Sequence, residues 1–212
     1  MKKNRFYTVV HTLFAGVFKL LFRVKIVGKE NEPSEDKVFL VCSNHISAVD
    51  PILVGACLDR HQVHYMAKKE LFSIPVVSWF AKNMGAFPVD RGGGDVGAVK
   101  KSINFLKNGE CVGLFPQGTR QAGKDPRSTK VKAGAGMIAH HANVDILPVH
   151  IYREGYVSKM LKRTVISIGK PIPFSEFSFD ADKSGEYLRI SSEIFDRICT
   201  VGEEAIEECQ KK

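Results

Sequence analysis

A histidine and an aspartate stand five residues apart in the segment VCSNHISAVDP, residues 41–51. A neutral imidazole that an aspartate holds through one ring nitrogen can take a proton from a hydroxyl through the other. The aspartate also stabilises the imidazolium that forms. The two side chains cannot share one helix face, because five residues turn a helix by about 140°. This chemistry therefore requires the turn between them to fold back and bring His45 onto Asp50.

The same segment also has interpretations without such a pair. Pro51 suits the first position of a helix, and Asp50 would then cap that helix through its carboxylate, with His45 an incidental loop residue. A further interpretation makes Cys42 an acyl-accepting nucleophile, although it lies in a predicted strand without a clear activating group. These alternatives stay open on this segment alone.

Three later segments carry groups that bind anions. GAFPVDRGGGD ends a strand with Arg91 and three glycines, which let the backbone approach a ligand closely. LFPQGTR ends another strand with Gly118, Thr119 and Arg120, which offer a backbone N–H, a hydroxyl and a guanidinium. VKAGAGMIAHH, residues 131–141, opens a helix with small residues, and a helix N-terminus favours anions. Each segment could instead be a plain turn, a solvated charge or a close helix contact.

The composition describes a globular chain with a strong positive charge. Its 212 residues are 44% hydrophobic, which suits one large domain with a sizeable core. The formal net charge of +8 indicates an anionic partner. The basic residues do not interleave with aromatic ones on a stripe, so we expect no nucleic acid partner. Five cysteines without a Cys-x-x-Cys pair indicate a reduced, cytosol-facing protein, and the histidine spacings predict no metal site.

Short β-branched runs alternate with helical patterns along most of the chain. This alternation predicts an α/β fold with a mainly parallel central sheet flanked by helices. The predicted strands cover residues 37–43, 63–68, 86–90, 111–116, 145–151 and 164–172. The predicted helices lie near residues 51–58, 71–83, 95–108, 133–142 and 184–208. Functional groups collect where the strands of such sheets end, and the polar loop 118–130 is the best candidate for a mobile active-site segment.

The first 28 residues predict a separate amphipathic helix. Polar side chains fall in one narrow arc of that helix, apolar ones occupy the rest, and basic residues flank both ends. The pattern favours a helix that lies flat in a membrane interface, with its lysines and arginines near anionic headgroups. A core helix packed on the domain is the alternative. A signal peptide fits less well because Lys19 and Arg23 interrupt the apolar region, and no apolar run is long enough to span a bilayer.

In order and spacing, these segments resemble the glycerolipid acyltransferase family, and most closely its bacterial 1-acyl-sn-glycerol-3-phosphate (lysophosphatidic acid) acyltransferases. The first family block, Asn-His followed by Asp after four residues, is present as Asn44-His45 and Asp50. The later blocks are present as GAFPVDR, FPQGTR and DILPVHI. The resemblance covers about residues 25 to 175, which is most of the chain.

The resemblance implies that residues 29–212 form an acyltransferase domain. It would move a fatty acyl group from acyl-CoA or acyl-acyl carrier protein to the free hydroxyl of lysophosphatidate, giving phosphatidate, with no cofactor or metal. His45 would be the general base and Asp50 its orienting partner. The substrate-binding residues would be Asn44, Lys68, Arg91, Gln117, Gly118, Thr119 and Arg120. The apolar residues 71–80 would accommodate the acyl chain or contact the membrane. The protein would sit on the anionic cytoplasmic face of the bacterial cell membrane as a peripheral or monotopic protein.

Gln117 departs from the family pattern, which usually has Glu at this position. Glutamine keeps the size and one acceptor oxygen, but it loses the charge and gains two donors. If the family glutamate only accepts hydrogen bonds, glutamine can replace it; if its charge balances an arginine, acceptor choice differs. Two alternatives therefore stay open: an acyltransferase that acts on a different lysolipid acceptor, and a non-catalytic membrane- or lipid-binding protein on the same scaffold.

Overall fold

The computed structural model describes residues 4–90, 96–180 and 182–210. Within these residues one seven-stranded sheet has the order β1-β7-β6-β2-β5-β3-β4. Neighbouring strands pair in parallel except β6 and β7, which are antiparallel. The strands are β1 (Val24–Val27), β2 (Phe39–Ser43), β3 (Val63–Lys68), β4 (Phe87–Val89), β5 (Cys111–Leu114), β6 (Asp145–Arg153) and β7 (Thr164–Ile168).

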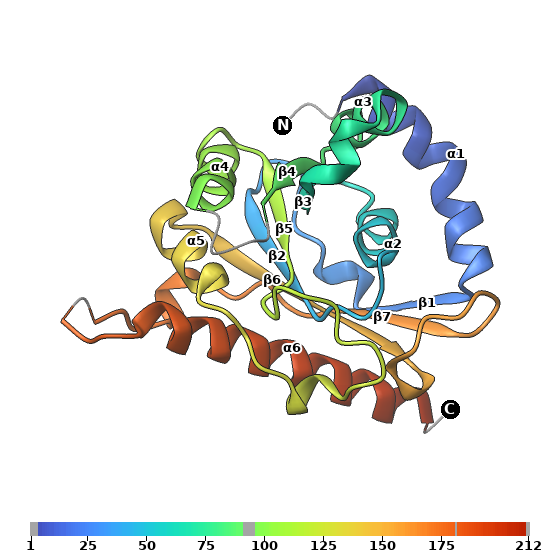
Figure 1. Cartoon of the computed structure of the whole chain (residues 1–212). Helices are drawn as coiled ribbons and strands as arrows, with labels where there is room; N and C mark the ends of the chain where they lie inside the picture. Colours follow the sequence, from blue (N-terminus) through green and yellow to red (C-terminus); the bar gives the residue numbers. More distant parts are fainter. Residues whose placement is uncertain (1–3, 91–95, 181, 211–212) are drawn as a thin grey trace.

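Helices cover both faces of this sheet, which confirms the predicted α/β architecture (Figure 1). On one face lie α1 (Arg5–Leu21), α2 (Asp50–Cys57) and α3 (Pro75–Asn83); on the other lie α4 (Val96–Lys107), α5 (Gly134–Ala142) and α6 (Glu186–Gln210). Central strand β2 is buried throughout because Phe39 and Val41 pack toward α2 while Leu40 and Cys42 pack toward α5 and α6. Burial on both faces explains the continuous apolar run of this strand in the sequence.

The six predicted strands and the predicted helices all form, and β1 is the strand that the sequence patterns did not indicate. Its four residues, Val24–Val27, are all half-buried at the edge of the sheet, where they pair with β7. VKIV is only four residues long, and it has neither a continuous apolar run nor a sustained alternation of apolar and polar residues. The sequence therefore gives no strand signal there. The first 28 residues thus supply a sheet strand as well as a helix.

Helix α1 combines the two interpretations that the sequence left open. On one side Tyr7 and Ala15 are buried, and the Tyr7 hydroxyl donates to the His61 carbonyl at 3.4 Å. The opposite side exposes a row of large apolar side chains: Val9, Leu13, Phe14, Val17 and Leu20. Within the described part of the chain, no helix is both long and apolar enough to cross a bilayer.

Part of the polar side of α1 packs against the domain, whereas Arg5, Thr8 and Thr12 on that side are exposed. The Lys19 ammonium lies 3.6 Å from the Asp59 carboxylate, and a ring nitrogen of His11 lies 3.2 Å from the Gly55 carbonyl oxygen. The domain itself therefore supplies an anionic partner for Lys19.

A buried carboxylate, that of Glu32, fixes the region on which α1 docks. It accepts the backbone N–H groups of Asp59 and Arg60 at 3.1 and 2.7 Å and the Lys29 ammonium at 2.8 Å. A ring nitrogen of His61 lies 3.2 Å away. Burial alone would raise the pKa of Glu32, but the hydrogen bonds from His61 and Lys29 hold it at about 2. The cluster therefore joins the segment after β1 to the connection between α2 and β3.

Replacing Glu32 by glutamine is expected to lower the free energy of unfolding by about 2 kcal/mol at pH 7, because buried donors lose a charged acceptor. The folded pKa of about 2 lies below the ordinary 4.5. The stabilisation is therefore complete above pH 4.5 and is lost as the pH falls toward 2. Urea unfolding at pH 7 and pH 3 should show a smaller difference between wild type and variant at pH 3.

The matched control is Glu30→Gln, because Glu30 is exposed on the same short helical turn, Lys29–Asn31. Its effect should stay within about 0.5 kcal/mol. An equal loss of stability at both pH values in Glu32→Gln would contradict the assignment of a charged, hydrogen-bonded carboxylate.

Candidate active site

The carboxylate of Asp50 organises the turn that precedes α2. Its Oδ2 accepts the backbone N–H groups of Ile46 and Ser47, both at 2.6 Å, and lies 3.0 Å from Nδ1 of His45. Helix α2 begins at Asp50, and its N-cap residue Val49 makes no side-chain hydrogen bond. One interpretation of the sequence expected Asp50 to cap α2, but its carboxylate instead binds backbone N–H groups of the turn before the helix. These hydrogen bonds fold the turn back and bring His45 onto Asp50.

A second charged side chain, Arg153, holds the other oxygen of the same carboxylate. Its guanidinium donates to Oδ1 of Asp50 at 3.0 Å and, through Nε, to the Thr164 hydroxyl at 3.1 Å. Arg153 is 1% exposed and lies over the ring of Phe22. Sequence analysis missed it because the predicted strand ended two residues too early, although a cation at the carboxyl end of a parallel strand is a signal of a functional site.

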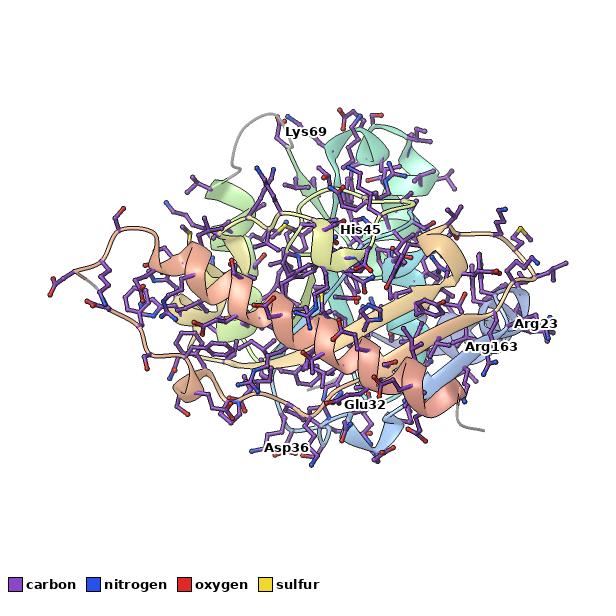
Figure 2. All side chains as sticks on the ribbon, turned by 90° about the horizontal axis from the view of Figure 1, so that it is seen from below. Arg23, Glu32, Asp36, His45, Lys69 and Arg163 are labelled. Atoms are coloured by element: carbon purple, nitrogen blue, oxygen red, sulfur yellow. The ribbon has the colours of Figure 1, made fainter. Side chains whose placement is uncertain are left out.

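The imidazole of His45 is fixed on several sides. Because a carboxylate only accepts, Nδ1 carries the proton and Nε2 is left as an acceptor. The ring stacks on Phe115 with 4.0 Å between centroids. The backbone N–H donates to Oε1 of Gln117 at 2.7 Å, and the carbonyl accepts the Gln121 N–H at 2.8 Å. Figure 2 shows His45 near the middle of the molecule. Asp50 holds Nδ1, so Nε2 is the ring nitrogen left for a substrate.

His45 borders a cavity of about 660 Å³ at the carboxyl ends of β3 and β5, beside α4 and α5. Most of its wall is apolar, formed by side chains that include Met66, Leu71, Val96, Val99, Leu114, Met137 and Ile138. A polar part of the wall brings together four residues expected to bind substrate: Lys68, Gly118, Thr119 and Arg120. Arg91, also expected there, lies outside the described residues. An anionic group joined to a long apolar chain matches these two kinds of wall.

Two further groups lie at the cavity: Lys132, which the sequence did not single out, and the start of α5, which the sequence placed among the anion-binding segments. Lys132 lines it, and Gly118 provides the space for this lysine: a Cβ on Gly118 would lie 2.8 Å from the Lys132 side chain, and the φ of Gly118 is +70°. Gly134, the first residue of α5, lines the same wall, so the positive end of that helix faces the cavity. Gly136 instead packs closely on α6, where a Cβ would lie 2.3 Å from the Tyr187 carbonyl oxygen.

Two residues expected to contact substrate have partners within the chain. Asn44 is 1% exposed, and its amide exchanges two hydrogen bonds with the backbone of Ile151 on β6. Gln117 is 4% exposed; besides accepting from His45, it donates from Nε2 to the Thr129 hydroxyl at 2.7 Å. Neither lines the cavity beside His45. Their amides position the turn and the loop, and their contact with substrate stays a prediction.

The loop of residues 118–130, expected to be mobile, is attached to α6 through Arg127. This guanidinium donates to Glu203 at 2.8 and 2.9 Å and to Asp196 at 3.2 Å. At the start of the loop, the Gln121 N–H is bound by His45. These contacts anchor the loop that carries Thr119 and Arg120 at both of its ends.

The alternative of a cysteine nucleophile is not supported. Cys42 is fully buried on the face of β2 that packs against α5 and α6, and burial raises the pKa of its thiol far above the ordinary value. A protonated thiol in the core is not a nucleophile. Among the described residues, no group of three or more His, Cys, Asp or Glu side chains is placed to hold a metal ion.

The chain is similar in sequence and in fold to several known proteins. The family model described as Acyltransferase matches residues 23–152. A 1-acyl-sn-glycerol-3-phosphate acyltransferase of Bacillus subtilis (strain 168) is 36% identical over 157 residues, or 73% of this chain and 76% of that protein. One of Streptococcus pneumoniae (strain ATCC BAA-255 / R6) is 32% identical over 168 residues, or 76% of this chain and 61% of that protein. The crystal structure of the 1-acyl-sn-glycerophosphate acyltransferase PlsC from Thermotoga maritima has the same fold, with a TM-score of 0.63, 23% identity and coverage of 95% and 96%.

The buried pair of Asp50 and Arg153 predicts a large energetic coupling. Arg153→Met should cost about 3 kcal/mol in free energy of unfolding, because it leaves a carboxylate buried without its charged partner. Asp50→Asn should likewise destabilise the protein. The double variant should be more stable than the sum of the two losses predicts, by about 1 kcal/mol or more. Urea unfolding of all four proteins measures this cycle, and strictly additive losses would contradict a direct interaction.

Proposed function

The chain belongs to the acyltransferase family, and we propose that it transfers a fatty acyl group from an acyl thioester to the free hydroxyl of lysophosphatidate, giving phosphatidate. The observation that carries this proposal is the His45–Asp50 pair, which opens onto a cavity with apolar walls and a cationic side. The relatives named 1-acyl-sn-glycerol-3-phosphate acyltransferases support the same reaction.

The geometry around His45 suits general base catalysis. Nε2 of His45 accepts the proton of the acceptor hydroxyl. The hydroxyl oxygen of the acceptor attacks the thioester carbonyl carbon at the same time, forming the new C–O bond. The imidazolium is stabilised by Asp50 through Nδ1, and Arg153 keeps that carboxylate in place. The tetrahedral intermediate then collapses, the C–S bond breaks, and the departing thiolate takes the proton from His45. The products are an ester and a free thiol carrier, so no metal or cofactor enters the balance.

The apolar and the polar walls of the cavity bind different parts of the two substrates. The acyl chain occupies the apolar wall, where burial of each methylene is favourable. The acceptor phosphate lies toward Thr119, Arg120, Lys132 and the N-terminus of α5, which supply a hydroxyl, two cations and helix N–H groups. Lys68 lies on the same cavity, and the family pattern adds Arg91. The donor is acyl-CoA or acyl-acyl carrier protein, both of which present the thioester that this chemistry requires.

The exposed apolar face of α1 supports attachment to a membrane, and α3 extends it. Phe6 on α1 packs edge-on against Trp79 on α3, with 4.9 Å between ring centroids, so the two helices lie together (Figure 1). Helix α3 and the turn before it also expose Ile74, Val76 and Phe80. The net positive charge favours an anionic leaflet. The proposed location is the cytoplasmic face of the bacterial cell membrane, with the protein peripheral or monotopic and α1, within residues 1–28, as its main attachment.

Acyl transfer from a labelled thioester to lysophosphatidate in mixed micelles tests the proposal. The wild type should make phosphatidate, and His45→Ala should lose about 10³-fold in rate because the general base is removed. His141→Ala is the matched control, since His141 is exposed on α5 and does not line the cavity. It should retain the wild-type rate.

Three results would count against this account. A folded His45→Ala protein with the wild-type rate would remove the assigned base. A folded wild type that is inactive with both CoA and carrier-protein donors would favour a non-catalytic lipid-binding protein. If Gln117→Glu changed which lysolipid is acylated, residue 117 would select the acceptor, whereas the structure gives its side chain to His45 and Thr129.

A further inference from the structure

Residues 157–163, VSKMLKR, form an unusual surface segment in the connection between β6 and β7. Val157, Met160 and Leu161 are 40%, 62% and 64% exposed. Three basic residues, Lys159, Lys162 and Arg163, are exposed among them, and the segment contains no acidic residue. Surface connections are normally polar. Large apolar side chains interspersed with basic ones are instead typical of segments that lie in a membrane interface.

This segment continues the exposed apolar face of α1. The Leu161 N–H donates to the Leu21 carbonyl at 2.8 Å, at the last residue of α1. Leu20, the neighbouring residue on the helix, is 77% exposed. Figure 1 shows the connection between β6 and β7 beside this end of α1. Leu161 and Met160 thus extend, from a remote part of the sequence, the apolar row that begins at Val9.

The basic side chains of this edge also come together. The parallel register pairs Val24 on β1 with Thr164 on β7, so Arg23 and Arg163 precede two paired residues. Figure 2 shows both arginines at the same edge of the molecule. No ion pair of Arg23 or Arg163 occurs within the described ranges. By contrast, Arg189 on α6 pairs with Glu186 and Glu193.

The segment also lies next to the loop that carries the site. The Tyr156 carbonyl, just before the segment, accepts the Gly123 N–H of the 118–130 loop at 2.9 Å. Three residues earlier, Arg153 holds the Asp50 carboxylate. A surface that contacted lipid here would place the site close to the bilayer from which a lysolipid acceptor enters.

We propose that residues 157–163 are a membrane contact, separate in sequence from α1 and α3, that binds an anionic leaflet. Met160 and Leu161 enter the interface, while Lys159, Lys162, Arg163 and Arg23 bind lipid phosphates. This proposal rests on the membrane attachment proposed above and extends it. Met160 and Leu161 continue the exposed apolar row of α1, and this continuity with the proposed membrane face favours a lipid surface over an acidic protein partner.

Binding to vesicles of phosphatidylglycerol and phosphatidylethanolamine, and to vesicles of phosphatidylcholine alone, tests this contact. Met160→Ser with Leu161→Ser should reduce the partition coefficient on anionic vesicles about tenfold, because two aliphatic side chains leave the interface. Lys159→Gln with Lys162→Gln and Arg163→Gln should weaken binding to anionic vesicles and reduce its salt dependence, with little change on phosphatidylcholine. Leu188→Ser, which removes a 46% exposed leucine from α6, is the matched control and should bind like wild type.

The outcomes separate this contact from the proposals on which it rests. Activity on dispersed, water-soluble substrates should stay at the wild-type level in every variant, since none alters the cavity. Variants that bind vesicles as the wild type does would overturn the contact while leaving α1 and α3 as attachment sites. A wild type that binds neither vesicle would overturn membrane attachment itself. Normal vesicle binding with a rate lost only for carrier-protein donors would make the segment a protein docking site instead.

Discussion

The fully buried carboxylate of Asp50 is the constraint on which the site depends. A charge removed from water is costly unless donors replace its hydration. Here two backbone N–H groups, an imidazole and a guanidinium supply the donors for both oxygens. These donors come from the turn after β2 and from the end of β6, which are neighbours in the sheet with Ser43 opposite Val149. The parallel sheet thus brings Arg153 across more than 100 residues of sequence to complete a pair that the turn begins.

The requirement that buried polar groups have hydrogen-bond partners also explains the glutamine at position 117. Its Oε1 accepts from the His45 backbone, and its Nε2 donates to Thr129, whose own hydroxyl donates to the Pro126 carbonyl. A glutamate at this position could accept from His45, but Thr129 would have to turn its hydroxyl away from Pro126 to donate to it. Glutamine therefore satisfies each donor and acceptor in this series of hydrogen bonds, from His45 to Pro126, without placing a second carboxylate beside the base. Through its hydrogen bond with the His45 backbone, the side chain of Gln117 helps to position His45.

Much of the fold was predictable from sequence because its signals are local. Continuous apolar runs marked the buried strands, and breakers with small residues marked the helix starts, so β2, β5 and α5 were placed to within a few residues. The pair of His45 and Asp50 was recognisable from residue types, spacing and family resemblance. Arg153 was not, since its role depends on a neighbour distant in sequence. The partners of Asn44 and Gln117 within the chain were not predictable either, because the direction of a side chain at a strand end is set by tertiary contacts that sequence does not display.

The central claim is that the site holds His45 ready as a base before substrate arrives. The most direct test is the protonation pattern of its ring, read from ¹⁵N chemical shifts of histidine-labelled protein near pH 8 and assigned by comparison with His45→Ala. The hydrogen bond to Asp50 predicts a proton on Nδ1 and an unprotonated Nε2 in the wild type. It also predicts loss of that preference in Asp50→Asn. A wild-type ring protonated on Nε2 would contradict the account, because the nitrogen that faces the substrate would then be unable to accept its proton.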